Sequence, residues 1–281
     1  TEILENMLVF LRDNAVSDDK HAGCTIKADE DLFGWSLSEG ASVWSTSVAI
    51  ISLFDNYNVW ERHSKTIVES VVWLSTQRNI VDLGWAYQNY NNCNVNAIMT
   101  ALALRAIAKA LQNKDKLSFP EKEVKNLQTA LVSGFHYLKN TVVTDKKVSY
   151  WTFNKVGHCT ATTWALMALY EISKIDDYDE VKTFYKEHHE KAMRFILSKI
   201  PRKSARWADE KMVEEGGAKY SKQKNYYSFC VTLLPQLFTL GLSPYHPKVV
   251  SQISWIIKKN HLLMIKKKIW KKCMIRWMRV I

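Results

Sequence analysis

The sequence predicts an all-α protein built from helical hairpins that repeat about every sixty residues. Its 9 Gly and 5 Pro in 281 residues leave little material for the tight turns of an all-β fold. Its apolar content of 47% and charged content of 24% are typical of a globular chain. An aromatic residue also recurs in similar helical segments at regular spacing, and such a period indicates a repeat architecture. The recurring positions are Phe10, Trp73, Tyr137, Phe195 and Trp255, which are 63, 64, 58 and 60 residues apart.

Two classes of helical segment alternate along residues 1–257. The first class is amphipathic and charged on one side, and it covers residues 1–13, 64–77, 123–141 and 181–199. The second class is apolar nearly all round and rich in Ala, Ser and Thr, and it covers residues 41–55, 94–111, 158–172 and 226–242. Such alternation predicts four hairpins and the start of a fifth, arranged as a ring with one helix layer inside and one outside.

One loop carries a more specific signature, W-L-x-x-Q-x6-G-W, at Trp73, Leu74, Gln77, Gly84 and Trp85. This signature and the hairpin period resemble the prenyltransferase and squalene–hopene cyclase (terpenoid cyclase) repeat family, whose members form an α/α toroid. In that family the Gln and Trp are structural, and one residue usually separates the Gly from the Trp, whereas here they are adjacent. Family toroids commonly close with more hairpins than this chain supplies. The expected ring is therefore incomplete: an open ring, a truncated domain, or one that a partner chain closes.

The loops that lead into the apolar helices are expected to converge on one mouth of the ring. An aromatic cavity with a few polar groups suits a lipophilic or cationic ligand. The alternative is that many of these side chains only pack a helical core. The candidate ligand-binding residues are Trp35, Trp44, Tyr87, Asn94, Asn96, Trp151, His158, Trp164, Tyr226 and Tyr227.

The resemblance leaves catalysis open. Cyclases of the family start their reaction with an acid in a D-x-D-D motif, which this sequence lacks; its nearest match, residues 29–31, is expected to be solvated loop charge. Prenyltransferases of the family use zinc to activate a thiol. The weak zinc candidates here are Cys93, His158, Cys159 and Cys230, with buried core cysteine as the alternative. His188 and His189 lie on an amphipathic helix and are expected at the surface.

The basic charge is concentrated at the end of the sequence. Residues 258–281 hold nine of the bases that give the chain its formal charge of +11, so residues 1–257 are nearly neutral and no nucleic-acid partner is expected. This basic amphipathic segment suits peripheral contact with a membrane surface, with a solvated last helix as the alternative. No apolar run approaches the roughly 20 residues needed to span a bilayer, so a cytoplasmic location is expected.

Two classes of function follow from these observations. The first is a terpenoid cyclase-like or prenyltransferase-like protein that binds an isoprenoid-type ligand in an aromatic cavity. The second is a non-catalytic toroid that binds a peptide or protein partner, since a fold alone does not fix a function. Assembly into an oligomer is compatible with either.

Overall fold

The computed structural model is predominantly helical in the residues that it describes, which are 15–17, 33–35, 41–55, 64–87, 94–153, 155–200, 233–251 and 253. The all-α expectation is therefore confirmed for this part of the chain. The chain divides into two compact units, Thr1–Ile196 and Leu197–Ile281. The predicted boundary at residue 257/258 lies outside the described residues, as do the expected first helix and the basic segment.

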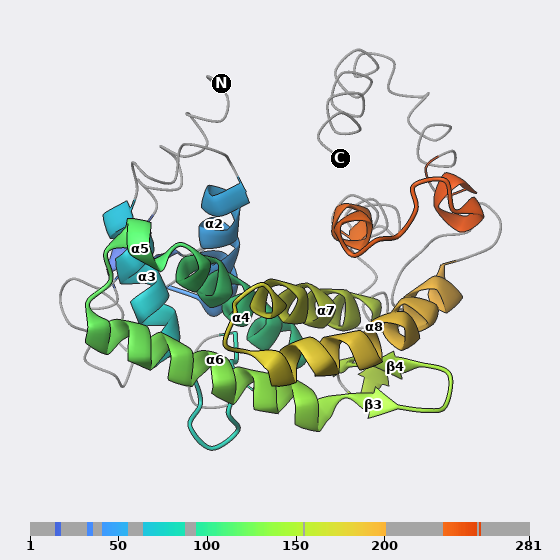
Figure 1. Cartoon of the computed structure of the whole chain (residues 1–281), viewed down its shortest axis with the longest axis horizontal. Helices are drawn as coiled ribbons and strands as arrows, with labels where there is room; N and C mark the ends of the chain where they lie inside the picture. The colour runs from blue at the N-terminus through green and yellow to red at the C-terminus, as the bar shows by residue number, and fades with distance from the viewer. Residues whose placement is uncertain are drawn as a thin grey trace, which may run out of the picture. The chain divides into compact units, whose positions relative to one another are not determined.

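Three apolar helices form the inner layer of the first unit: α2 (Val43–Asp55), α4 (Ala97–Gln112) and α7 (Cys159–Ser173). Helix α4 packs against both α2 and α7 and lies between them (Figure 1). Thirteen of the sixteen residues of α4 are buried, because neighbouring helices cover it on several sides. Residues 97–111 and 159–172 of the expected inner helices are thus helical, and both expected helices begin slightly later than expected.

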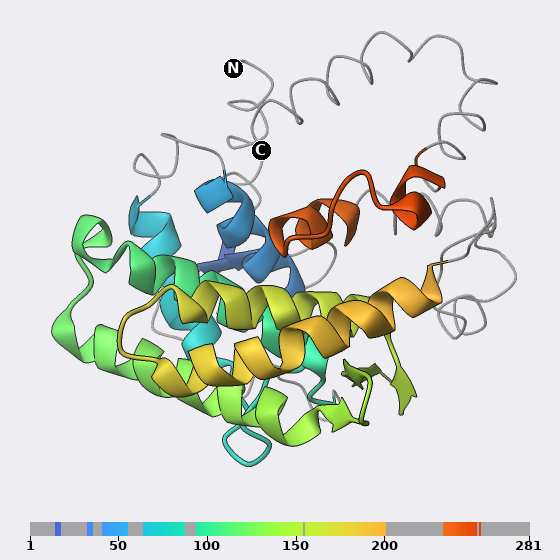
Figure 2. The same ribbon diagram turned by 45° about the vertical axis from the view of Figure 1, so that its right-hand side comes forward.

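Three amphipathic helices cover this layer: α3 (Ser64–Thr76), α6 (Glu121–Thr141) and α8 (Asp179–Lys199). Figures 1 and 2 show α8 running alongside α6. The rings of Phe135 and Phe184 meet edge to face there, with centroids 5.6 Å apart, and Lys139 pairs with Glu180 at 2.6 Å. These bounds confirm that amphipathic and apolar helices alternate over residues 64–199, as expected.

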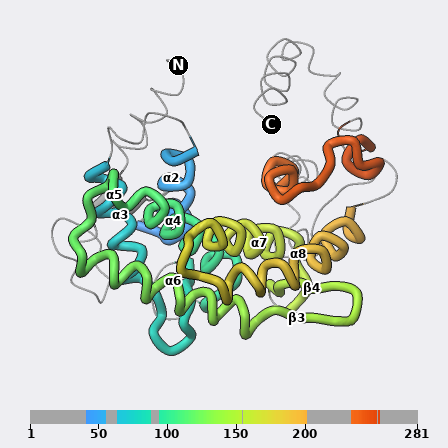
Figure 3. The backbone as a smooth tube through the Cα atoms, viewed as in Figure 1, coloured from blue at the N-terminus to red at the C-terminus, as the bar shows by residue number. Residues whose placement is uncertain are grey.

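Short connections complete the first unit. The one-turn helix α5 (Lys114–Leu117) joins α4 to α6. Three antiparallel strand pairs occur: β1 (Ala15–Ser17) with β2 (Phe33–Trp35), β3 (Val143–Thr144) with β4 (Ser149–Tyr150), and β5 (Thr152–Phe153) with β6 (Val156–Gly157). The last two pairs link α6 to α7, as the backbone tube in Figure 3 shows for β3 and β4.

The described part of the second unit comprises residues 197–200, which include the last residues of α8, and residues 233–251 and 253, in which 233–239 and 247–251 are helical. The helical stretch 233–239 ends in a turn in which Gly241 N–H donates to the Phe238 carbonyl and Leu242 N–H to the Leu237 carbonyl. The ammonium group of Lys248 donates to the carbonyl of Leu197.

Candidate functional site

Trp85 fixes the loop that enters α4. Its indole N–H donates to the carbonyl of Leu74 near the end of α3 at 2.7 Å, and its backbone N–H donates to the hydroxyl of Thr100 at 3.0 Å. Its own carbonyl accepts the backbone N–H of Asn96 at 3.2 Å. The side chain of Asn96 caps α4 by accepting from the backbone N–H groups of Ile98 and Met99. One buried tryptophan thus ties the end of an outer helix to the start of the next inner helix.

Trp151 makes the same set of bonds one repeat later. Its indole N–H donates to the carbonyl of Leu138 at 2.8 Å, and its backbone N–H donates to the hydroxyl of Thr162 at 3.1 Å. Its carbonyl accepts the backbone N–H of His158 at 3.0 Å, and His158 Nδ1 caps α7 by accepting from Ala161 N–H. Trp151 is therefore enclosed and structural, and Asn96 and His158 are both helix caps.

Glycines allow the close packing around Trp85. A Cβ atom on Gly134 of α6 would lie 2.6 Å from the Trp85 ring and 2.8 Å from Leu104 Cδ2. A Cβ on Gly84 would lie 2.6 Å from the Thr100 hydroxyl and 2.6 Å from Val95 Cγ1. Carbon atoms do not approach this closely without displacing a neighbour. The Gly-Trp pair of the signature therefore serves packing against the start of α4 and against α6.

Among the candidate residues, Trp44 and Trp164 meet on the inner layer. Their ring centroids are 5.0 Å apart and their planes are tilted by 49°. Trp44 comes from α2 and is partly exposed, whereas Trp164 comes from α7 and is 6% exposed. Among the described residues, the indole N–H of Trp164 has no hydrogen-bond partner, and neither does the hydroxyl of Ser47, three residues after Trp44 on α2. An aromatic surface with an unused buried donor is equipped to hold an apolar ligand that carries one acceptor atom.

The other candidates do not join this pair. Tyr87 is 39% exposed and Asn94 is also exposed. Trp35 lies in β2, where the structure describes the backbone alone, and Tyr226 and Tyr227 lie outside the described residues. The expected mouth is thus represented in the described residues by one aromatic pair and two helix caps.

The zinc candidates find no support within the described residues. No group of three His, Cys, Asp or Glu side chains there is arranged to hold a metal ion. Cys159 is 1% exposed in the first turn of α7, next to the capping His158. Cys93 and Cys230 lie outside the described part of the chain.

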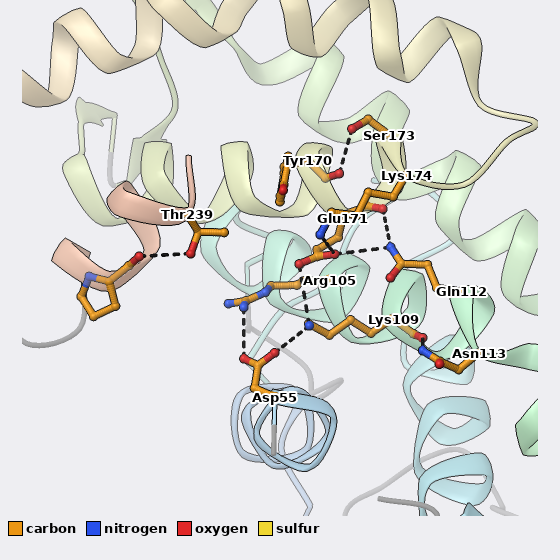
Figure 4. Close-up of polar contacts among 11 residues, drawn as sticks. Asp55, Arg105, Lys109, Gln112, Asn113, Tyr170, Glu171, Ser173, Lys174 and Thr239 are labelled. Carbon is orange, nitrogen blue, oxygen red and sulfur yellow. Dashed lines mark hydrogen bonds and ion pairs between the residues drawn. The ribbon is translucent and has the colours of Figure 1, made fainter. Parts of the chain in front are cut away.

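A charged network joins the carboxyl-terminal ends of the three inner helices (Figure 4). Lys109 of α4 lies between Asp55 at the end of α2, 2.6 Å away, and Glu171 of α7, 3.7 Å away. Arg105 also pairs with Asp55 at 3.3 Å. The Glu171 carboxylate further binds Lys174 at 2.9 Å, and Gln112 donates to the Glu171 carbonyl at 2.6 Å.

Glu171 is charged although it is buried. Burial alone would raise its pKa, but the positive charges of Lys109, Lys174 and Arg105 and the hydrogen bond from Lys174 outweigh burial and lower it. None of the residues of this network was among those predicted from the sequence. Its signal was present, because Asp55, Arg105, Lys109 and Glu171 are the charged residues in three otherwise apolar helices, and each lies in the second half of its helix.

A buried serine–histidine pair connects β4 to α8. The Ser149 hydroxyl lies 3.0 Å from Nδ1 of His188, and both residues are buried. The surface position expected for His188 is wrong: it is 5% exposed and its ring contacts Phe184 at a centroid distance of 4.2 Å. Its pKa is lowered by burial, against the opposing charge of Glu187. Because Ser149 is fully enclosed, the pair serves packing and is not a nucleophile with its base.

No helix within the described residues is long and apolar enough to cross a membrane. The chain matches no protein-family model, and neither the curated proteins nor the solved structures include a significant match.

Proposed function

We propose that this chain binds a lipophilic ligand of the isoprenoid type against the Trp44–Trp164 pair, as a protein similar to the terpenoid cyclases and prenyltransferases. The observation that carries the proposal is the meeting of these two rings on the inner helix layer, where the indole N–H of Trp164 has no hydrogen-bond partner among the described residues. The partly exposed ring of Trp44 offers an apolar surface beside the buried Trp164, and the Trp164 donor selects a ligand with an acceptor such as a hydroxyl oxygen.

The repeated tryptophan anchors support this proposal by fixing the inner helices. Trp85 and Trp151 each hold the start of an inner helix, and the network around Lys109 joins the opposite ends. Helices held at both ends keep their inner side chains in place without a ligand, which lowers the entropy lost on binding. We further propose that the helices around the pair form an α/α toroid and that the protein is cytoplasmic. No reaction is assigned to the site.

The test is binding of radiolabelled farnesol, measured by equilibrium dialysis below its micelle concentration. The matched variants are Trp44→Ala, which removes half of the aromatic surface, and Trp164→Phe, which keeps a ring but removes the N–H donor. Tyr245→Ala is the control, since Tyr245 is an aromatic residue 83% exposed in the second unit. We expect Trp44→Ala to weaken binding at least tenfold, equivalent to about 1.4 kcal/mol, and the control to bind like the wild type. Unchanged farnesol binding by a folded Trp44→Ala variant would rule the site out.

A peptide-binding function is the second candidate, and one observation favours it. The loop between α3 and α4 exposes two β-branched apolar side chains, Ile80 at 78% and Val81 at 88%. A rigid loop that carries adjacent exposed apolar residues is a common feature of protein contact surfaces.

A further inference from the structure

The loop of residues 78–84 is held in one conformation. The side-chain oxygen of Asn79 accepts the backbone N–H groups of Val81 and Asp82, both at 2.9 Å, and Asn79 N–H donates to the Gly84 carbonyl at 2.8 Å. Leu83 closes the turn with a positive φ of 64°. Because the loop is closed by its own hydrogen bonds, Ile80 and Val81 are displayed to solvent without needing to be ordered by a partner.

Arg78 fastens this loop to α6. Its guanidinium group donates to the Ser133 hydroxyl at 2.7 Å and to the Thr129 carbonyl at 3.1 Å. Figures 1 and 2 show the segment after α3 projecting past α6. The loop is therefore anchored at its base and presented at its tip.

A polar pocket borders this loop at Asp82. It has a volume of about 430 Å³ and is lined by Asp82, Asn94, Val95, Tyr137, Asn140 and Thr141. The Tyr137 hydroxyl donates to the carbonyl of Val95 at 3.3 Å, which fixes the ring as one wall. Burial, and then the charge of Asp82, raise the pKa of Tyr137 to about 12, so its hydroxyl stays neutral beside that carboxylate.

The pocket offers hydrogen-bond acceptors and one negative charge. The carboxylate of Asp82 forms no ion pair with any described residue, and the amide of Asn140 makes no hydrogen bond to any of them. Asn94 presents a second exposed amide. A cationic group suits such a pocket because Asp82 supplies charge and the amides supply acceptors, whereas a phosphate or carboxylate would meet repulsion.

We propose that this surface binds an extended peptide segment of a partner protein in which an apolar residue and a lysine or arginine stand two positions apart, so that both side chains face the loop. The apolar side chain packs on Ile80 and Val81, and the basic side chain enters the pocket to pair with Asp82. The amides of Asn94 and Asn140 are placed to bond the peptide main chain. This inference refines the peptide-binding candidate function, and it does not involve the Trp44–Trp164 pair, so the farnesol experiment and the experiment below fail independently.

The test is fluorescence anisotropy of the full chain with three labelled peptides in which every second residue is Ser and the residues between are, in turn, Leu and Lys, Leu and Glu, or Ser and Lys. The chain carries a formal charge of +11, so nonspecific attraction would favour the Glu peptide. We expect the Leu–Lys peptide to bind at least tenfold more tightly than the other two. Tighter or equal binding of the Leu–Glu peptide would overturn the proposal.

Variants separate the two parts of the surface. We expect Asp82→Asn to reduce the preference for Leu–Lys over Leu–Glu below threefold, and Val81→Ser to weaken Leu–Lys binding at least fivefold. Asp115→Asn, at another exposed aspartate, is the control and should leave both peptides unaffected. A folded Asp82→Asn variant with unchanged preference overturns the charge assignment. Lysinamide that binds as tightly as the Leu–Lys peptide would identify a free-amine site and overturn the peptide assignment.

Discussion

Trp151 repeats the hydrogen bonding of Trp85 bond for bond. Each indole N–H donates to a leucine carbonyl at the end of an outer helix, at 2.8 and 2.7 Å, and each backbone N–H donates to a threonine hydroxyl in the first turn of an inner helix, at 3.1 and 3.0 Å. Each carbonyl accepts from the capping residue of that inner helix. The same set of contacts therefore occurs in two successive hairpins, and the corresponding residues are 62 to 66 positions apart.

The threonine of this device predicts a stability loss when its hydroxyl is removed. Thr100→Val and Thr162→Val keep the side-chain shape but leave the buried backbone N–H of Trp85 or Trp151 without an acceptor, which costs about 1–3 kcal/mol. Chemical denaturation should show this loss in both variants, and Thr→Ser at either position should recover most of it. The control is Thr129→Val, whose side chain is exposed on α6. Two valine variants as stable as the wild type would contradict the role of the hydroxyls.

Gly134 is expected to resist substitution although it lies in the middle of α6. Alanine would improve helix propensity by about 1 kcal/mol, but its Cβ would lie 2.6 Å from the Trp85 ring and 2.8 Å from Leu104. Such overpacking costs about 1–3 kcal/mol and shifts the neighbours. We therefore expect Gly134→Ala to lower the thermal unfolding midpoint and to change the near-ultraviolet circular dichroism of Trp85. Asn126→Ala, at an exposed position of the same helix, should do neither; a Gly134→Ala variant more stable than the wild type would refute the packing argument.

Lys109 is expected to be the most important charge of the inner-helix network. It contacts both Asp55 and Glu171, and the Glu171 side chain is 4% exposed. Removal of one partner of a buried pair leaves the other charge uncompensated, so Lys109→Met should cost about 3 kcal/mol in urea denaturation. Lys174→Met, at a residue whose side chain is 42% exposed, should cost clearly less. An equal cost for the two variants would show that the burial of the lysine itself does not matter.

The same network predicts acid sensitivity. The pKa of Glu171 is lower in the folded chain than in the unfolded chain, so its contribution to stability is complete above the unfolded-state pKa and declines as the pH falls toward the folded-state pKa. Glu171→Gln should therefore flatten part of the loss of stability on acidification below about pH 4.5. A denaturation series over pH would measure this slope for the variant and the wild type.

His188 predicts a second pH effect in a different window. Burial lowers its pKa below the ordinary value of 6.5, although the charge of Glu187 opposes this and that of Lys191 reinforces it. The unfolded chain then binds more protons than the folded chain just below pH 6.5, so stability falls as the pH decreases through that region and is complete above it. His188→Asn should remove this dependence while keeping a polar group near Ser149. The neighbouring His189→Gln should retain it, and a wild-type-like slope in His188→Asn would contradict the assignment.

Alternation of amphipathic and apolar segments predicted the helices over residues 64–199 because each pattern reflects how many sides of a helix are covered. The signature around Trp73 and Trp85 predicted a structural tryptophan correctly. The helical period could also have predicted that His188 is buried, since His188 lies on the same face of α8 as the buried Phe184, Ala192 and Phe195. The charged residues next to His188 in the sequence made this segment resemble an exposed face, and the surface position was predicted for that reason.

The rest could not be predicted in the same way. Whether Trp151 faces a cavity or a core depends on which carbonyl its indole N–H reaches, and this depends on the three-dimensional position of Leu138. Glu171 and Asp55 are 116 positions apart and are brought together only by the packing of α2 and α7 on α4. The pocket behind Asp82 likewise combines one loop with the end of α6.

Thr46 tests whether the anchoring device extends to the hairpin before Trp85. Trp151, His158 and Thr162 are separated by seven and four positions, and Trp35, Ser42 and Thr46 have the same separations. Thr46 is fully buried in α2, and the Ser42 hydroxyl accepts the Ser45 backbone N–H as a helix cap would. We therefore expect Thr46→Val to lower the free energy of unfolding by about as much as Thr162→Val, about 1–3 kcal/mol, with recovery in Thr46→Ser. A Thr46→Val variant of wild-type stability would confine the device to the two hairpins in which it is described.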